Sequence, residues 1–256
     1  LADRAVSPET KADVILHRDQ PFPGQVGSFG FSVKIGHAIA AANCPPNNTA
    51  ASLVIGAPGK PGTTGNAPGT IFHLPAGALC LAPSNPAVPV LIDPETIGQL
   101  LQSPDAENDD EFGYSVALGH LLLDSVTADD VIVGARGAKQ GAGRVSVFPV
   151  ADGVVSRANG HVVRFEGKAG DGLGEVLAVG DLDQDLDATL RPLGNLDDLA
   201  AGAVGADNGK VLLVKGPLSP TGGRDADGIY RESVDTELKS ILGEKSGDFF
   251  GFSLDI

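Results

Sequence analysis

The sequence repeats one series of short apolar runs three times, always in the same order. The first run follows a Phe-Gly or Leu-Gly pair, at residues 29–36, 112–119 and 173–180. The second contains a Gly-Ala pair, at 53–58, 131–136 and 199–204, and the third begins at Gly69, Gly143 and Gly209. Such units must stack on one another, because a single unit cannot bury its own apolar faces.

Each repeat is predicted to form four antiparallel strands. A looser fourth run follows the third, around 89–92, 160–165 and 228–234. The 35 glycines and 18 prolines among 256 residues favour turns and short strands over long helices. Repeats of four strands are typical of propeller blades. We therefore predict an all-β fold, a β-propeller of four-stranded antiparallel blades, with full repeats at about 29–105, 112–170 and 173–243.

Both ends of the chain carry part of a further repeat. Residues 250–256 (FGFSLDI) repeat the start of the first run, and an apolar run at 12–18 precedes the first Phe-Gly pair. We predict that 11–20 and 249–256 share an incomplete blade that closes a small ring. Two alternatives stay open. First, the run at 12–18 also matches a second strand of the repeat. Second, the whole chain can be a fragment of a larger propeller.

The best-preserved copies have a recognisable signature. The segments FGYSV, DDVIVGAR and GRVSVF of the second repeat, and FGFSV, SLVIGAPG and GTIFHL of the first, resemble the FG-GAP repeat. This repeat is the blade of the integrin α-subunit propeller and of related extracellular proteins. The resemblance covers roughly residues 29–256, although the third copy keeps only part of the signature. It implies an all-β propeller, an extracellular or cell-surface location, and calcium in the loops of the blades.

Through this resemblance, the acidic loop between the first two strands of the third repeat is predicted to bind Ca²⁺. The family loop reads about Asp-x-Asp/Asn-x-Asp-Gly-x-x-Asp-Leu. Here Leu186 stands where the family has glycine, and an insertion precedes the last position, which leaves Asp197 as one substitute ligand. Alternating carboxylates suit a hard cation with about six to eight oxygen ligands. The predicted ligands are Asp181, Asp183, Asp185, Asp187 and Asp198. The alternative is a solvated acidic loop.

Histidines occupy the first position of this loop in the other two repeats. His37 and His120 follow the glycine that ends the first run, as Asp181 does. No carboxylate follows either histidine at ligand spacing. Common ancestry of the repeats therefore explains these histidines better than a metal site.

The charge of the chain restricts its partners. The formal net charge is −15, which disfavours binding to nucleic acid or to an anionic membrane and favours cations. No run of about 18 apolar residues is present, so we expect no membrane insertion.

The chain has two cysteines, Cys44 and Cys80. Cys44 falls in the predicted loop between the first and second strands, and Cys80 falls just after the third strand. In an up-and-down meander these loops lie on the same face, so a disulfide between them is predicted, which would indicate an oxidising compartment. Two free buried thiols are the alternative.

Motifs of catalysis are incomplete in this sequence. Residues 56–60 (GAPGK) resemble a phosphate-binding loop, but Pro61 replaces the required Ser or Thr. Residues 30–34 (GFSVK) lack the second glycine of a nucleophile elbow, and Tyr114 and His161 are too far apart to assign a site. We therefore expect no enzyme.

Three functions remain in order of preference. The first is a non-enzymatic extracellular calcium-binding propeller module for adhesion or for recognition of a protein or glycan. The second is an enzyme, or an accessory domain of an extracellular lyase or hydrolase. The third is a structural spacer in a large surface protein. Ligand contacts are expected in the insertions at 37–50, 59–68, 93–111 and 217–228.

Overall fold

The computed structural model describes most of the three repeats. The described residues are 14–16, 28–40, 49–59, 68–78, 90–92, 97–103, 107, 109–122, 128–157, 162–182, 196–206, 208–218, 229–231 and 238–255. Almost all regular structure among them is β-strand, which confirms the predicted all-β class. Ile97 is helical, and α2 (Ala138–Gly141) is a short turn in which Lys139 and Gln140 have left-handed backbone conformations.

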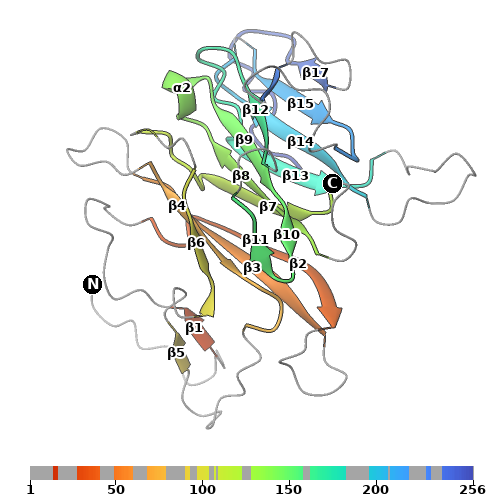
Figure 1. Cartoon of the computed structure of the whole chain (residues 1–256). Helices are drawn as coiled ribbons and strands as arrows, with labels where there is room; N and C mark the ends of the chain where they lie inside the picture. The colour runs from red at the N-terminus through yellow and green to blue at the C-terminus, as the bar shows by residue number, and fades with distance from the viewer. Residues whose placement is uncertain are drawn as a thin grey trace, which may run out of the picture.

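Three larger sheets follow one another along the chain and through the molecule (Figure 1). Sheet 1 has the strand order β2-β3-β4-β6, with β2 (Ser32–Ala40), β3 (Thr49–Ala57), β4 (Thr70–Leu74) and β6 (Gln99–Leu101). Sheet 2 has the order β16-β12-β9-β8-β7, with β7 (Ser115–Gly119), β8 (Asp130–Ala135), β9 (Arg144–Phe148), β12 (Val163–Glu166) and β16 (Ile229–Arg231). Sheet 3 has the order β13-β14-β15-β17, with β13 (Val176–Gly180), β14 (Asp198–Ala203), β15 (Lys210–Val214) and β17 (Leu238–Leu242).

Two small strand pairs complete the described structure. Strands β1 (Val14–Leu16) and β5 (Val90–Ile92) pair in parallel. Strands β10 (Val150–Ala151) and β11 (Val154–Val155) form a hairpin beyond the end of β9.

Sheet 2 lies between the other two sheets. Its strands are apolar on both faces because both faces are covered. One core cluster joins sheet 2 to sheet 1 and includes Val54, Ile71 and Val133. A second joins sheet 2 to sheet 3 and includes Ile132 and Leu199. A strand covered on both faces has no solvent side for polar residues, which is why β8 is buried along its whole length. The first strands of the three sheets, β2, β7 and β13, lie next to one another.

The fourth strands differ from the prediction in two repeats. In sheet 1 the fourth strand is β6, which lies inside the segment 93–111 that was predicted to be an insertion, whereas β5 pairs with β1. In sheet 3 the fourth strand is β17, whereas β16 crosses to sheet 2 and pairs in parallel with β12. A run of three apolar residues does not indicate which strand it will pair with. The tertiary structure decides which sheet edge each run joins.

The described residues do not join the two ends of the chain in one blade. Strand β1 pairs only with β5 in its two-stranded sheet. Residues 251–255 form turns and irregular structure, while Phe250 makes a single parallel bridge to Gly209. Of the predicted incomplete blade of 11–20 and 249–256, the structure describes only residues 14–16 and 249–255, so the blade stays a prediction.

A line of glycines connects the sheets. Within each sheet, the amide of the glycine that follows the aromatic or leucine residue donates to the carbonyl of a glycine in the second strand, as from Gly113 to Gly134 at 3.0 Å. The second-strand glycine then faces the carbonyl of the next sheet's turn. A Cβ placed on Gly134 would lie 2.1 Å from the Gly174 oxygen. Glycine is required at this position because any side chain would separate the two sheets.

Candidate functional site

One repeat position gathers aromatic and charged residues directly before the first strands of the three sheets and in the turn at Phe250. It is the residue directly after each Phe-Gly or Leu-Gly pair, namely Phe31, Tyr114, Glu175 and Phe252. The rings of Phe31 and Tyr114 are in contact, with 4.8 Å between their centroids. Phe31 is 54% exposed and Phe252 is 68% exposed. Together with Arg136, these four residues form a surface that we call the FG face.

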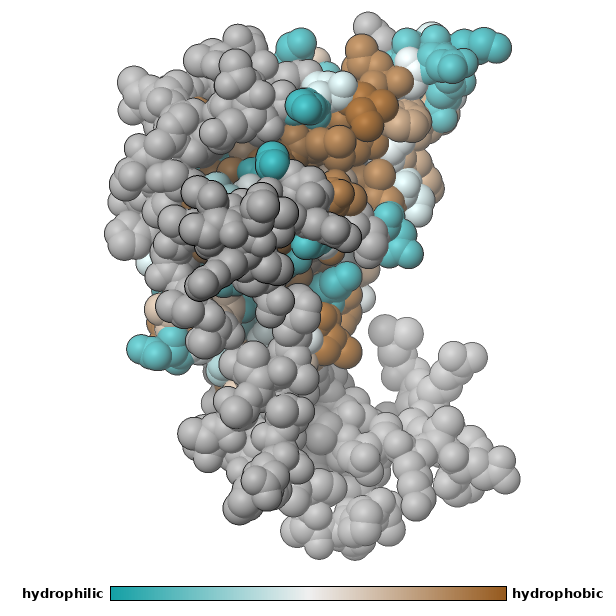
Figure 2. Space-filling model, turned by 90° about the vertical axis from the view of Figure 1, so that its right-hand side faces the viewer, coloured by the Kyte–Doolittle hydropathy of each residue, from teal (hydrophilic) through white to brown (hydrophobic). Residues whose placement is uncertain are grey.

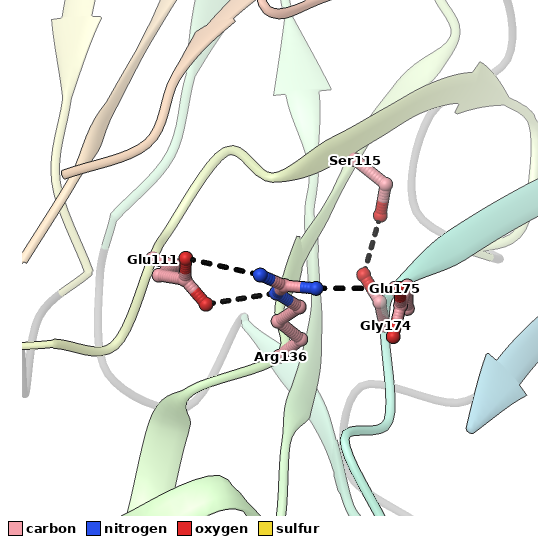
Figure 3. Close-up of polar contacts among 5 residues, drawn as sticks. All are labelled: Glu111, Ser115, Arg136, Gly174 and Glu175. Atoms are coloured by element: carbon pink, nitrogen blue, oxygen red, sulfur yellow. Dashed lines mark hydrogen bonds and ion pairs between the residues drawn. The ribbon is translucent and has the colours of Figure 1, made fainter. Parts of the chain in front are cut away.

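Arg136 is the centre of the polar contacts on the FG face (Figure 3). It follows the last residue of β8, and its guanidinium carbon lies 3.9 Å from the centroid of the Tyr114 ring. Its Nε donates to Oε2 of Glu111 at 2.8 Å, and its Nη1 donates to Oε1 of Glu175 at 3.3 Å. A guanidinium is therefore stacked on a ring and paired with carboxylates of two different sheets.

The electrostatics keep this group charged. Burial by itself lowers the pKa of Arg136, but the hydrogen bond and the charge of Glu111 outweigh it, so that the pKa is raised. Burial raises the pKa of Tyr114, against the opposing effect of the Arg136 charge. Arginine and tyrosine thus keep their ordinary protonation states at neutral pH. The arrangement suits recognition of charge and ring surfaces rather than proton transfer.

Two serines fix the turns that carry the FG face. The hydroxyl of Ser115, in the first strand of sheet 2, donates to the carbonyl oxygen of Gly174 at 2.6 Å (Figure 3). Ser32, at the equivalent position in sheet 1, donates to the carbonyl oxygen of Gly113 at 2.9 Å. Each serine therefore binds the turn of the following sheet. The two serines thus join successive sheets by hydrogen bonds.

Three aspartates shape the approach to these turns. Asp110, Asp171 and Asp248 each lie two residues before the aromatic or leucine residue of the pair. Each accepts a hydrogen bond from the backbone amide three residues before it, at 2.9, 3.0 and 2.8 Å respectively. These side-chain turns hold the loop that precedes each pair, including the loop that carries Glu111.

The predicted calcium loop is described only at its two ends. Asp181 is exposed at the end of β13. Asp198 is buried at the start of β14, where Oδ2 accepts from the Leu182 amide and Oδ1 from the Gly216 amide, both at 2.9 Å. The remaining predicted ligands, Asp183, Asp185 and Asp187, lie outside the described residues.

An aspartate in sheet 2 binds backbone amides as Asp198 does, although no acidic loop precedes it. Asp130 is its repeat equivalent, and Oδ2 of Asp130 accepts from the amides of Leu121 and Leu122 at 2.9 and 2.8 Å. The shared function of these aspartates is to bind the backbone of the loop between the first two strands. Sequence reasoning assigned Asp198 to a metal and did not recognise this function.

The neighbouring Asp197 links two sheets. Its Oδ2 accepts from the backbone amide of His120 at 2.8 Å, and its own amide donates to the His120 carbonyl at 2.9 Å. Among the described residues, no group of three or more His, Cys, Asp or Glu side chains is arranged to hold a metal ion. Cys44, Cys80 and His161 lie outside the described residues.

A hollow of about 620 Å³ lies at the end of the FG face that belongs to sheet 3. Its lining comes from the ends of sheet 3 and from the turn that follows it: Glu175, Val204, Gly205, Asp248, Phe249 and Phe252. Two of these residues are carboxylates and two are phenyl rings. Phe249 is 62% exposed and has a left-handed backbone conformation, with φ of 51°.

Sequence reasoning did not identify the cluster around Arg136. Glu111 precedes Arg136 by 25 residues and Glu175 follows it by 39, so no local motif contains the three. A signal was present in the repeats, because the residue after Gly-Ala changes from Pro58 to Arg136 to Val204 while its neighbours stay similar. The three repeats therefore differ in side-chain size and charge at this position.

Comparison with models of known protein families finds no match to this chain. A search of curated proteins also finds no matching sequence. Within the described residues, no helix is long and apolar enough to cross a membrane.

Proposed function

We propose that this chain is a non-enzymatic extracellular recognition module that binds a protein ligand through its FG face. The observation that carries the proposal is the gathering of Phe31, Tyr114, Arg136, Glu175 and Phe252 on one surface. Exposed aromatic residues and arginine are the residue types that contribute most energy to protein interfaces. Here they lie in short turns, four of them directly beside the end of a strand, rather than on long loops, which lowers the entropy lost on binding.

The scaffold in this proposal is a propeller of the FG-GAP type. Three features support it: consecutive four-stranded repeats, first strands that lie next to one another, and the same glycine contact from each sheet to the next turn. The third of these contacts, from Gly202 to the carbonyl oxygen of Gly251, supports the proposal that the turn at Phe250 begins a further blade. In a propeller the FG face would surround one end of the axis.

A binding panel with matched variants tests the recognition function. Wild type and the Phe31→Ser/Phe252→Ser variant are passed over immobilised extracellular proteins and over a glycan array. Val154→Ser is the control, because Val154 is 55% exposed in the β10–β11 hairpin at the opposite ends of the strands. We expect a protein ligand that the control retains and the double variant loses. A ligand found only on the glycan array, no ligand on either panel, or equal binding by both variants would overturn the proposal.

We also propose that the loop from Asp181 to Asp198 binds Ca²⁺. The donors fit the ion chemically, because closely spaced carboxylates supply the oxygen ligands that calcium requires. Asp198 would contribute while its oxygens keep their two amide contacts, and the other ligands would come from Asp181, Asp183, Asp185 and Asp187. Bound calcium would neutralise the loop and fix it to the ends of β13 and β14.

Calorimetry and thermal melting test the calcium proposal. We expect saturable Ca²⁺ binding and a higher melting temperature with wild type, and neither with Asp183→Ala. Asp152→Asn removes an equal charge from the β10–β11 turn and should behave like wild type. If millimolar calcium does not bind, or if Asp183→Ala binds it equally well, the loop is an acidic surface only.

A further inference from the structure

Sheet 2 carries a fifth strand on its outer edge. Strand β16 pairs in parallel with β12, the fourth strand of this sheet, and Phe165 lies opposite Tyr230 in the register. The chain supplies this fifth strand from the third repeat, between β15 and β17. Phe165, in the strand that β16 pairs with, is 1% exposed. The outer edge of a sheet in this protein can therefore accept one more strand.

The corresponding edge of sheet 3 is β17. It is the last strand of its sheet in the part of the chain that the structure describes (Figure 1). Ile241 corresponds to Phe165, because each pairs with the same repeat position of the third strand. Yet Ile241 is 47% exposed, and Leu242 beside it is 64% exposed. The edge of sheet 3 thus exposes an apolar position that is buried in sheet 2.

Strand β17 has few of the features that normally keep an exposed edge from pairing. Such edges are usually very short, bulged, or marked by proline and several charges. Strand β17 has five residues, no proline and one charged residue, Lys239, and it pairs with β15 without a register shift. The outer strand of sheet 1, β6, has only three residues, and Leu101 in it is 1% exposed. Among the outer strands of the three described sheets, β17 is best suited to pair with a further strand.

The charge of this edge fits a second copy of the same chain. Residues 238–248 contain two basic residues, Lys239 and Lys245, and two acidic residues, Glu244 and Asp248, so their net charge is zero. The whole chain has a net charge of −15, so two copies repel each other over most of their surfaces. A neutral edge with exposed apolar side chains is where that repulsion is weakest.

We propose that two copies of this chain associate through their β17 strands, which pair antiparallel about a two-fold axis and join two four-stranded sheets into one. A two-fold interface is self-complementary, and it is the commonest symmetry of protein dimers. The inference goes beyond the proposed recognition function and does not depend on it. Strand β13, which begins beside Glu175 of the FG face, lies at the opposite edge of sheet 3 from β17.

The register follows from the side chains that would meet. Directly opposite side chains in a sheet share a face, so an antiparallel pair with this symmetry is centred on a residue. Centring on Leu242 would set Lys239 against Lys245 of the second copy, which is repulsive. Centring on Ser240 would set Lys239 against an isoleucine. Centring on Ile241 sets the two isoleucines against each other, and the axis is therefore assigned to this residue.

Pairing of this length gives a weak dimer. A strand of five residues a side buries less than the roughly 1,200 Å² of a stable interface, so we expect a dissociation constant on the order of 10–100 µM. Burial of Ile241 and Leu242 supplies the apolar contribution, and the backbone hydrogen bonds of the edge fix the geometry.

Sedimentation velocity of the full chain over about 5–500 µM measures the association. We expect monomer at the lowest concentration and mostly dimer at the highest. Ile241→Lys places two like charges at the axis and should weaken association at least about tenfold. Val154→Lys adds the same charge at a residue that is 55% exposed in the β10–β11 hairpin, and should dimerise like wild type.

Two results of this experiment would overturn the inference. One is a monomer at every concentration, which would leave the edge to a strand of another protein. The other is a dimer that Ile241→Lys does not weaken, which would place the interface on another surface.

A mixture of two variants tests the axis itself. Ile241→Glu should also be monomeric, because two glutamates meet at the axis. An equimolar mixture with Ile241→Lys sets lysine against glutamate and should restore association to within about tenfold of wild type. Circular dichroism of each variant beforehand ensures that only folded chains are mixed. A mixture that associates no better than either variant alone would contradict two-fold pairing at Ile241.

Discussion

The turns at Phe112 and Leu173 are buried, whereas the turn at Phe250 is exposed. All three make the same backbone contacts, since each aromatic or leucine residue forms a parallel bridge to the glycine that begins the third strand of the preceding sheet. Yet Phe112 and Leu173 are each 1% exposed and Phe250 is 38% exposed. The conformation of the turn is therefore independent of its burial.

This difference separates two sources of stability. Glycines with positive φ allow the close approach of each turn, as at Gly143 and Gly209 before the third strands, where a Cβ would collide with the backbone of the next turn. Burial comes from the sheet that follows, and within the described residues none follows sheet 3. Hydrophobic residues are accordingly gathered on the exposed upper part of the side seen in Figure 2.

The largest expected effect comes from adding a methyl group at the buried junction. In Gly134→Ala the new Cβ would lie 2.1 Å from the Gly174 oxygen and 2.2 Å from Oγ of Ser115. Sheet 3 covers this turn, so the sheets must separate, and we expect a loss of at least about 3 kcal/mol in the free energy of unfolding. Urea unfolding measures it.

The matched change at the exposed turn is Gly202→Ala. Its Cβ would lie 2.2 Å from the Gly251 oxygen, nearly the same collision, but the turn has room to move away. We expect a loss of about 1 kcal/mol. Equal losses in the two variants would show that the turn at Phe250 is held as firmly as the turn at Leu173.

A buried histidine makes the junction of sheets 1 and 2 sensitive to pH. His73 in β4 is 1% exposed and pairs with Val54, a member of the core between these sheets. Burial lowers its pKa to about 4, against a smaller opposing effect of Gln99. The folded state therefore binds the proton less tightly than the unfolded state, whose histidine pKa is 6.5.

The contribution of His73 to stability is complete above pH 6.5 and is lost as the pH falls toward 4. The difference between the two pKa values predicts a loss of about 3 kcal/mol. Carboxylates titrate in the same range, so the measurement is the difference in urea unfolding between wild type and His73→Gln at pH 7 and pH 4. A difference that does not change with pH would contradict the assignment.

The smallest expected effect comes from removing one serine hydroxyl, first at the buried turn and then at the exposed turn. Ser115→Ala leaves the buried Gly174 carbonyl without its donor, and we expect a loss of about 1–2 kcal/mol. Ser253 occupies the same repeat position in the exposed turn, where water can replace any hydrogen bond that its hydroxyl makes. Ser253→Ala should change the free energy of unfolding by less than about 0.5 kcal/mol. A loss at Ser253 as large as that at Ser115 would indicate that the fourth turn is covered in solution.

The repeat pattern predicted the first three strands of every sheet because each begins or ends at a glycine that the backbone requires. Gly134 and Gly143 are two such positions in sheet 2. The fourth strands lack such a position. The apolar run at 90–92 was preferred to Gln99–Leu101 on local pattern, yet Leu101 is the one that pairs with Ile71. Three residues carry too little information to specify a partner strand.

The candidate site was less predictable than the fold. Asp198 fits the family's metal-binding pattern, but its oxygens accept two backbone amides that no sequence pattern reveals. Arg136 and its partners come from two sheets and meet only after these sheets have packed. Contacts of this kind depend on how one sheet packs against the next. The repeats imply that the sheets stack, but they do not indicate which side chains meet.

The sequence by itself determined the repeat unit, its antiparallel strands and its glycine turns. These follow from local chemistry, since a glycine at positive φ and a short apolar run act within a few residues. Only the tertiary structure decided which edge strand completes each sheet, which turn is buried, and where Arg136 finds its partners. It also decided that Val204, at the position of Arg136, leaves a hollow between Glu175 and Phe252. These outcomes depend on contacts between distant segments, and such contacts exist only when the sheets are packed together.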